Sequence, residues 1–126
     1  MDDGYCFVCG EKNEKGMHLD FETSSEGIAR VDYIIPAYFQ GYRHVIHGGI
    51  VATLLDEVMA KACLAAGLNA FTAEITVKFL KPVPAESALR LEGHVKEKRH
   101  RLINTEGSLS VGKEVCATAE AKFFVR

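Results

Sequence analysis

The chain has 126 residues, enough for one domain but too few for two independent hydrophobic cores. Hydrophobic residues make up 48%, charged residues make up 25%, and the formal net charge is -2, which leaves no basic field that would attract nucleic acid. No apolar stretch approaches the ~20 residues of a membrane span, and the opening MDDGYCFVCG lacks the pattern of a signal peptide. We therefore expect one cytoplasmic domain over residues 1–126 with no nucleic-acid or membrane partner.

The amino-terminal segment carries a single C-x-x-C motif, formed by Cys6 and Cys9. A structural zinc site uses a second cysteine pair or histidines at regular spacing, and His18 is only a weak candidate. No βαβ pattern surrounds the motif, which argues against a redox dithiol. The other two cysteines, Cys63 and Cys116, lie in apolar periodic segments and are expected in the core. We expect the motif to pack an amino-terminal arm, and we expect no metal and no cofactor.

Apolar residues that alternate with polar ones predict a set of β-strands. In the segment 73–79, for example, Ala73, Ile75, Val77 and Phe79 form one apolar side. The short links at 98–101 and 112–113 can close hairpins, so the strands should pair antiparallel. The predicted strands cover 28–35, 73–79, 89–95, 103–111 and 115–125, and a further strand near Met17 to Phe21 would complete the sheet.

One segment, residues 48–66, has the helical period instead, and Gly67 ends it. A single helix among strands predicts an α+β domain: an antiparallel five- to six-stranded sheet wrapped around one long central helix. The residues off the apolar face form a polar stripe, which taken alone would be a solvated face. The apolar face comprises Ile50, Val51, Leu54, Leu55, Val58, Met59, Ala62 and Cys63, and the polar stripe comprises Gly49, Thr53, Asp56, Glu57, Ala60 and Lys61.

The helix opens with His47, Gly48 and Gly49. Glycines at a helix start leave backbone N–H groups and the positive end of the helix dipole accessible to an anion or a polarised carbonyl. Such N–H groups can form an oxyanion hole. The alternative is that the two glycines only let the chain turn into the helix.

His47-Gly48-Gly49 followed by IVATLLDE resembles the helix start of the hotdog-fold acyl-CoA thioesterases, in particular the PaaI-like (phenylacetyl-CoA thioesterase-like) branch. The opening CFVCG, the strand 28–35, FQG before the histidine, FLKP at 79–82 and the terminal strand follow in that family's order. The resemblance covers nearly the whole chain. It implies the hotdog fold and hydrolysis of an acyl-CoA thioester to free acid and coenzyme A, without a metal.

The resemblance also implies roles for individual residues. Asp56 corresponds to the family's general base or nucleophile, and the N–H of Gly48 polarises the thioester carbonyl. Thr72 corresponds to a small hydroxyl residue that helps to hold the water. His47 taken alone could be a plain polar residue at the helix start; within the motif we expect it to orient rather than to act as the base. Gln40 lies near the family's amide position ahead of the histidine, although the strict spacing falls on Gly41.

Helix geometry bears on how such a site is assembled. At 1.5 Å rise per residue, Asp56 lies ~13 Å along the axis from His47, too far for both to act on one carbonyl. A two-fold dimer, in which Asp56 of one subunit reaches the Gly48 N–H of the other, removes the difficulty. We therefore expect a homo-oligomer, either a homodimer or a homotetramer built as a dimer of dimers.

Several further residues are expected to bind the acyl-CoA substrate. Glu57 differs from Asp56 by ~100° around the helix, so only one of the two can point straight into a given cleft, and we choose Asp56. Basic runs such as KEKRHR usually form solvated turns. The alternative is that the basic residues of this run donate charge-assisted hydrogen bonds to the phosphates of coenzyme A. The expected substrate-binding residues are Gly49, Glu57, Lys81, Lys98, Arg99 and Arg101.

Two other functions remain open for a chain of this kind. One is a non-catalytic acyl-CoA binding module on the same fold, although no DNA-binding segment is appended to make it a regulator. The other is a hotdog hydratase or dehydratase, whose paired His and Asp/Glu pattern is not found here.

Overall fold

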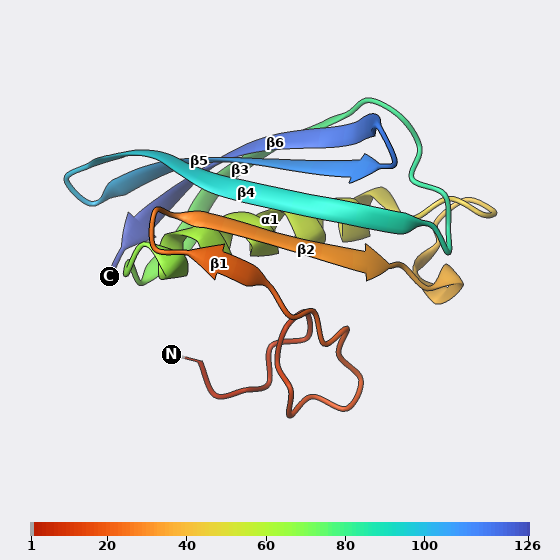
Figure 1. Cartoon of the computed structure of the whole chain (residues 1–126), viewed down its shortest axis with the longest axis horizontal. Coiled ribbons are helices and arrows are strands. Elements are labelled where there is room, and N and C mark those ends of the chain that lie inside the picture. Colours follow the sequence, from red (N-terminus) through yellow and green to blue (C-terminus); the bar gives the residue numbers. More distant parts are fainter. Residues whose placement is uncertain (1) are drawn as a thin grey trace.

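The computed structural model describes residues 2–126 as one curved sheet around one helix. Figure 1 shows the helix running alongside the strands, with the amino-terminal segment beyond the first strand. The elements are β1 (Glu22–Ser24), β2 (Ile28–Ile34), the 3-10 turn η1 (Ala37–Phe39), α1 (Gly48–Ala65), β3 (Ala70–Phe79), β4 (Ala88–Arg99), β5 (Leu102–Val111) and β6 (Glu114–Val125).

The six strands form one antiparallel sheet in the order β1-β2-β4-β5-β6-β3. The strands β4, β5 and β6 follow one another through tight turns, as the short links predict. The strand β3 follows α1 in the sequence but lies at the far edge of the sheet, beside β6. The helix therefore crosses the sheet between β2 and β3, and one edge of β3 has no partner strand among residues 2–126.

Helix α1 begins and ends where the sequence predicts, within one residue. His47 is the N-cap, and its ring Nδ1 accepts the N–H of Gly49 at 2.8 Å. Gly67 adopts a φ of 80°, a conformation that ends helices and favours glycine. The buried residues of α1 are Val51, Leu54, Leu55, Val58, Met59, Ala62 and Cys63, all of them members of the predicted apolar face.

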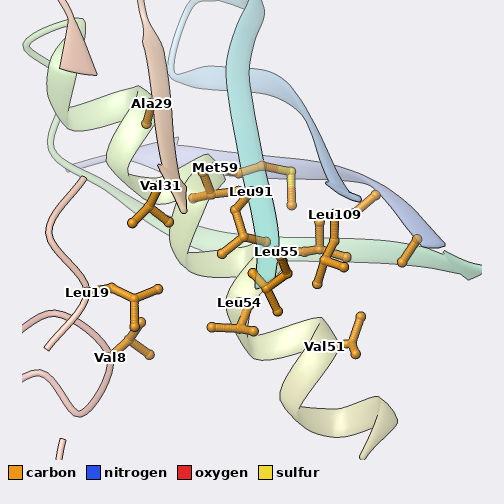
Figure 2. Packing of buried hydrophobic residues seen from close by; sticks show 14 of the residues in the cluster. Val8, Leu19, Ala29, Val31, Val51, Leu54, Leu55, Met59, Leu91 and Leu109 are labelled. Carbon is orange, nitrogen blue, oxygen red and sulfur yellow. The ribbon is translucent and has the colours of Figure 1, made fainter. Parts of the chain in front are cut away.

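The core forms where this face meets the concave side of the sheet. Figure 2 shows Leu54, Leu55 and Met59 of α1 beside strand residues such as Leu91 and Leu109. Burying apolar area of this kind is the dominant stabilising contribution to folding. Cys63 and Cys116 are buried, as predicted.

The expected strand near Met17 to Phe21 is wrong in position, because the sixth strand is β1, which begins at Glu22. Met17 and Leu19 are both buried, because they lie in an extended loop from which every second side chain packs onto the core. Their backbone N–H groups bond to the amino-terminal loop, at Phe7 O and Val8 O, rather than to a strand. The two-residue apolar period of this segment therefore comes from an extended loop that does not pair with the sheet.

Strand β3 contains a β-bulge that changes which residues face the helix. Its register shifts between Thr72 and Glu74, so that Thr72 pairs with Phe123, whose side chain is buried. The predicted inward position of Ala73 is therefore wrong. The extra residue at the bulge turns Thr72 toward α1 and leaves Ile75 and Val77 on the same face.

The link predicted at 98–101 is shorter in the structure. Strand β4 extends to Arg99, which pairs with Leu102, so Lys98 and Arg99 are strand residues and His100 and Arg101 alone form the turn. The longer strand adds backbone hydrogen bonds between β4 and β5, and the turn is correspondingly shorter. Over residues 2–126, no helix has the length and apolar character needed to cross a membrane.

Two paired glycines let the helix approach the sheet closely. Gly93 of β4 pairs with Gly107 of β5. A Cβ atom at Gly93 would lie 2.7 Å from the backbone oxygen of Val58 in α1, whereas one at Gly107 would first meet the flexible Met59 side chain, at 3.2 Å. Backbone cannot move aside as a methionine can.

We expect Gly93→Ala to lower the free energy of unfolding by about 1–3 kcal/mol, the usual cost of overpacking a core. Gly107→Ala is the matched control and should cost less, because Met59 can change rotamer. Urea unfolding of both variants, followed by circular dichroism, measures the difference. Equal losses would show that the Gly93 contact with α1 does not control the packing.

Candidate active site

The sequence-predicted catalytic residues occupy two places on α1. Gly48 lies at its first position and Asp56 lies near its middle, eight residues later. This separation corresponds to about 12 Å along the helix axis. Within one chain the structure therefore does not bring Gly48 and Asp56 to a common point.

Asp56 is half-buried and faces the edge strand β3. The Thr72 hydroxyl donates a hydrogen bond to Asp56 Oδ1 at 2.7 Å. Since the hydroxyl hydrogen is engaged, the remaining lone pairs of Thr72 and the second carboxylate oxygen are available to a water molecule. The β-bulge makes this contact possible, because without it Thr72 would face the other side of the sheet.

The start of α1 presents a backbone N–H to solvent. Among residues 2–126, no hydrogen-bond acceptor is found for the N–H of Gly48. The N–H of Gly49 is already satisfied by His47 Nδ1. Because Nδ1 accepts this bond, the neutral ring carries its proton on Nε2 and can donate outward. Gly48, rather than Gly49, is therefore the free donor at the positive end of the helix dipole.

Gly48 borders a groove with a volume of about 320 Å³ at the start of α1. Phe79 and Leu80 form one of its sides, and Lys81 lies at the end of that side. Lys81 also forms an ion pair with Glu114, at 3.1 Å. An apolar groove with one free N–H and one cation suits a carbonyl-bearing ligand with an anionic part. Asp56 is not among the residues that line this groove.

The amide of Gln40 holds the loop before the helix. Gln40 Oε1 accepts the N–H of His44 at 3.2 Å, and the backbone of Gln40 forms a β-bridge with Ile46. His47 in turn donates its backbone N–H to Phe39 O at 3.0 Å. In this arrangement Gln40 supports the loop that positions His47.

The basic residues do not form one cluster in the chain. Lys81 lies beside the β5–β6 turn, because its N–H bonds to Cys116 O. Lys98, Arg99 and Arg101 lie at the β4–β5 turn, and Arg101 donates to Val125 O at 3.2 Å. The two turns lie at opposite ends of β5, which corresponds to roughly 30 Å for a ten-residue strand.

Glu57 points away from Asp56, toward the amino-terminal loop. The thiols of Cys6 and Cys9 donate to its two carboxylate oxygens, at 3.5 and 3.6 Å. Lys61, one turn later on α1, hydrogen bonds Cys9. The polar stripe of the helix is thus not simply solvated: Glu57 and Lys61 lie partly buried under this loop. Sequence patterns did not link these residues, because they lie about fifty positions apart.

Burial and the nearby charge of Glu57 raise the pKa of the Cys9 thiol to about 11. Burial alone raises that of Cys63 to about 11 as well. At neutral pH neither is a thiolate, so neither has the reactivity of a catalytic nucleophile. Asp56 and the Gly48 N–H are a carboxylate and a backbone donor, the kinds of group that can serve as general base and oxyanion donor.

A single long helix enclosed by a six-stranded antiparallel sheet is the architecture of a hotdog protein. The family model described as Thioesterase superfamily matches residues 44–118. The chain therefore belongs to the thioesterase superfamily. The match includes α1 and β3, and with them Gly48, Asp56 and Thr72.

Individual relatives agree with this assignment. Acyl-coenzyme A thioesterase PaaI of Escherichia coli (strain K12) is 30% identical over 82 residues, which cover 65% of this chain and 59% of that protein. The crystal structure of a thioesterase superfamily protein superposes with a TM-score of 0.89 and 28% identity, over 98% of this chain and 61% of the other. The chain thus spans about three fifths of the length of these relatives.

A putative thioesterase from Ralstonia eutropha JMP134, described as related to phenylacetic acid degradation, has a TM-score of 0.77 and 25% identity over 85% of this chain and 84% of its own. The predicted hotdog fold and the resemblance to the PaaI-like branch are confirmed by these comparisons together.

Proposed function

We propose that this protein hydrolyses acyl-CoA thioesters to the free acid and coenzyme A. The observation that carries the proposal is the 2.7 Å hydrogen bond from Thr72 to Asp56, which holds a carboxylate at the edge of the sheet. Membership of the thioesterase superfamily supports the reaction class. The E. coli relative, named an acyl-coenzyme A thioesterase, supports coenzyme A as the thiol.

In this mechanism Asp56 acts on the thioester carbonyl carbon through water as a general base or directly as a nucleophile. Thr72 fixes one carboxylate oxygen and leaves the other for the reacting water or carbon. The Gly48 N–H donates to the carbonyl oxygen, where negative charge develops in the tetrahedral intermediate. The carbon–sulfur bond then breaks, and coenzyme A leaves as its thiolate. In the general-base route the proton that Asp56 took from water passes to this thiolate or to solvent. In the nucleophile route water hydrolyses the acyl–Asp56 anhydride, which releases the acid and restores the carboxylate.

The two halves of the site are proposed to come from different subunits of a dimer. Asp56 and Gly48 are about 12 Å apart along one helix, too far to share one carbonyl. Strand β3 offers an unpaired edge with exposed aromatic side chains, Phe71 at 54% and Phe79 at 58%. Exposed apolar edges of this kind mark interaction surfaces. A two-fold axis near β3 would bring the Asp56 of one subunit toward the Gly48 groove of its partner.

The groove at the start of α1 is the proposed entrance for substrate. Lys81 lines it and is the first candidate to meet a phosphate of coenzyme A. The basic residues Lys98, Arg99 and Arg101, at the other end of the sheet, would reach substrate only through another subunit or another part of the coenzyme. The apolar groove walls favour an acyl group without charge.

The proposal is tested by the thiol released from a panel of aromatic, short and long acyl-CoA substrates. We expect stoichiometric free coenzyme A and free acid from at least one class. A binding module would release no thiol. A hydratase or dehydratase would change the mass of the acyl chain by one water and leave the thioester whole. Either of those results would contradict the proposal.

Thr72→Val is expected to lower kcat by about 10- to 100-fold with little change in KM. A hydrogen bond to a charged group contributes about 1.5–3 kcal/mol, and each 1.36 kcal/mol corresponds to about tenfold in rate. Thr76→Val is the matched control, because Thr76 lies on the outer face of the same strand. Steady-state kinetics of both variants measures the effect. Equal kcat values for the two would argue against a role of Thr72 in holding Asp56.

A further inference from the structure

The contact between the amino-terminal loop and α1 brings together three metal-ligating side chains. The ligand atoms of Cys6, Cys9 and Glu57 all lie within 4.8 Å of one another, and all three residues are partly buried. The two thiols come from one turn of the loop, and the carboxylate comes from the middle of the helix. The proposed thioesterase mechanism uses none of these groups.

Each sulfur lies at a separation from one Glu57 oxygen that falls in the range of an S···O edge of a tetrahedral coordination sphere. Zn–S bonds of about 2.3 Å and Zn–O bonds of about 2.0–2.2 Å at tetrahedral angles require S···O separations of about 3.5–3.7 Å. The Cys6 and Cys9 sulfurs lie 3.5 and 3.6 Å from the two Glu57 oxygens. The two sulfurs contact different oxygens, Oε2 and Oε1, so coordination requires a side-chain rotation that brings both thiolates and one carboxylate oxygen to a common centre.

The loop is built to hold the two thiols on one side. Gly10 donates its N–H to Cys6 O at 2.8 Å, which closes the turn that contains both cysteines. A Cβ atom at Gly10 would collide with the Cys6 backbone nitrogen, so no other residue fits there without distortion. Val8, between the two cysteines, is buried in the core beside Leu19 and anchors the turn against the helix (Figure 2).

The charges around the three ligands also balance. Metal binding displaces the two thiol protons to solvent, and two thiolates and one carboxylate around a divalent cation then sum to a charge of -1. Lys61, partly buried and hydrogen bonded to Cys9, supplies the compensating positive charge. A partly buried metal site with no net charge avoids the desolvation cost of an unpaired ion.

We infer that Cys6, Cys9 and Glu57 form a zinc site that ties the amino-terminal loop to α1, with a water molecule as the fourth ligand. Two thiolates select a soft or borderline cation and exclude calcium and magnesium, which take oxygen ligands. Iron–sulfur clusters take four ligands, and Cys63 and Cys116 are buried elsewhere in the core. The site shares no residue with the proposed hydrolysis: Glu57 lies about 100° around α1 from Asp56 and contacts Cys6 and Cys9 rather than Thr72.

The test is titration of the reduced, chelator-treated full-length protein with cobalt(II), followed by zinc(II). We expect one cobalt ion per chain, with thiolate-to-cobalt charge-transfer absorption and the strong visible bands of a tetrahedral ion. One equivalent of zinc should abolish both. Zinc should also raise the midpoint of thermal unfolding, because a ligand that binds the folded state stabilises it.

Cys6→Ser and Cys9→Ser should lose the charge-transfer band. Glu57→Gln keeps both thiols but removes a direct ligand. Loss of an outer-shell partner weakens metal binding by about 10- to 100-fold, so this variant should weaken cobalt binding by more than that. Asp56→Asn, the neighbouring carboxylate, and Cys63→Ala, a core thiol, are matched controls and should retain the bands. Absence of thiolate absorption in the unmodified chain, or its persistence in Cys6→Ser, would overturn the zinc site. These readouts do not depend on turnover, so they remain valid if the protein hydrolyses no thioester.

Discussion

Replacement of Asp56 by asparagine is expected to lower kcat by about two to four orders of magnitude, the range contributed by a positioned general base. Asparagine keeps the shape of the side chain and can still accept the Thr72 hydrogen bond, but it can neither take a proton nor attack a carbonyl. The fold should stay intact, because Asp56 is half-buried and forms no ion pair among residues 2–126. Released thiol under saturating acyl-CoA measures kcat.

Glu57→Gln is the comparison that separates the two adjacent carboxylates. Glu57 lies about 100° around the helix from Asp56 and contacts Cys6 and Cys9, so we expect this variant to lose far less activity than Asp56→Asn. Circular dichroism and gel filtration of both variants check the fold and the oligomeric state. If Glu57→Gln were inactive while Asp56→Asn retained near-normal turnover, the choice of Asp56 would be wrong.

Mixing two inactive variants should restore activity if each active site is shared between two subunits. Asp56→Asn removes the chemistry and Gly48→Pro removes the N–H that polarises the carbonyl, so each homodimer has two defective sites. A heterodimer has one site with both defects and one with neither. Random pairing places half of the subunits in heterodimers, so an equal co-refolded mixture should regain roughly a quarter of the unmodified activity when the two defects act independently.

The structure indicates that Gly48→Pro can fold. Gly48 is the first residue of α1, where proline is favoured. Its N–H has no acceptor among residues 2–126, so no hydrogen bond is lost. His47 before it has a ψ of 134°, the extended conformation that a residue preceding proline adopts. A Cβ atom at Gly48 would lie 3.6 Å from the Phe79 ring, an ordinary contact.

Mass spectrometry under native conditions shows whether heterodimers have formed, and circular dichroism shows whether each variant has folded. A mixture that contains heterodimers but stays inactive would place the whole site within one chain and refute the shared-site proposal. Activity in the Gly48→Pro homodimer alone would instead refute the role of the Gly48 N–H.

Local periodicity was enough to predict the helix and most strands of this protein. The apolar face of α1 and the alternation in β5 and β6 depend on which neighbours along the chain share a side, and that information is local. His47, Gly48 and Asp56 could be proposed as site residues from the sequence, because the motif that resembles the hotdog thioesterases is continuous. The spacing along one helix was sufficient to place Gly48 and Asp56 about 12 Å apart.

Other features were decided by tertiary structure, because they depend on contacts between distant segments. The bulge at Ala73 is set by pairing with β6, and a shift of one residue reverses every side chain that precedes it. The alternation in 73–79 therefore assigned Ala73 to the inner face, whereas the fold presents Thr72 to Asp56. Met17 and Leu19 were assigned to a strand because an extended loop that packs on the core has the same period.

The partner of the C-x-x-C motif shows the same limit most clearly. Cys6 and Cys9 have no further ligand nearby in the sequence, and on that basis no metal was expected. Glu57 follows Cys9 by 48 positions, and nothing local marks its side chain as different from that of Asp56. The helix alone rotates one carboxylate toward β3 and the other toward the amino-terminal loop, about 100° apart, and which elements cover those two sides is settled only when the sheet closes around α1.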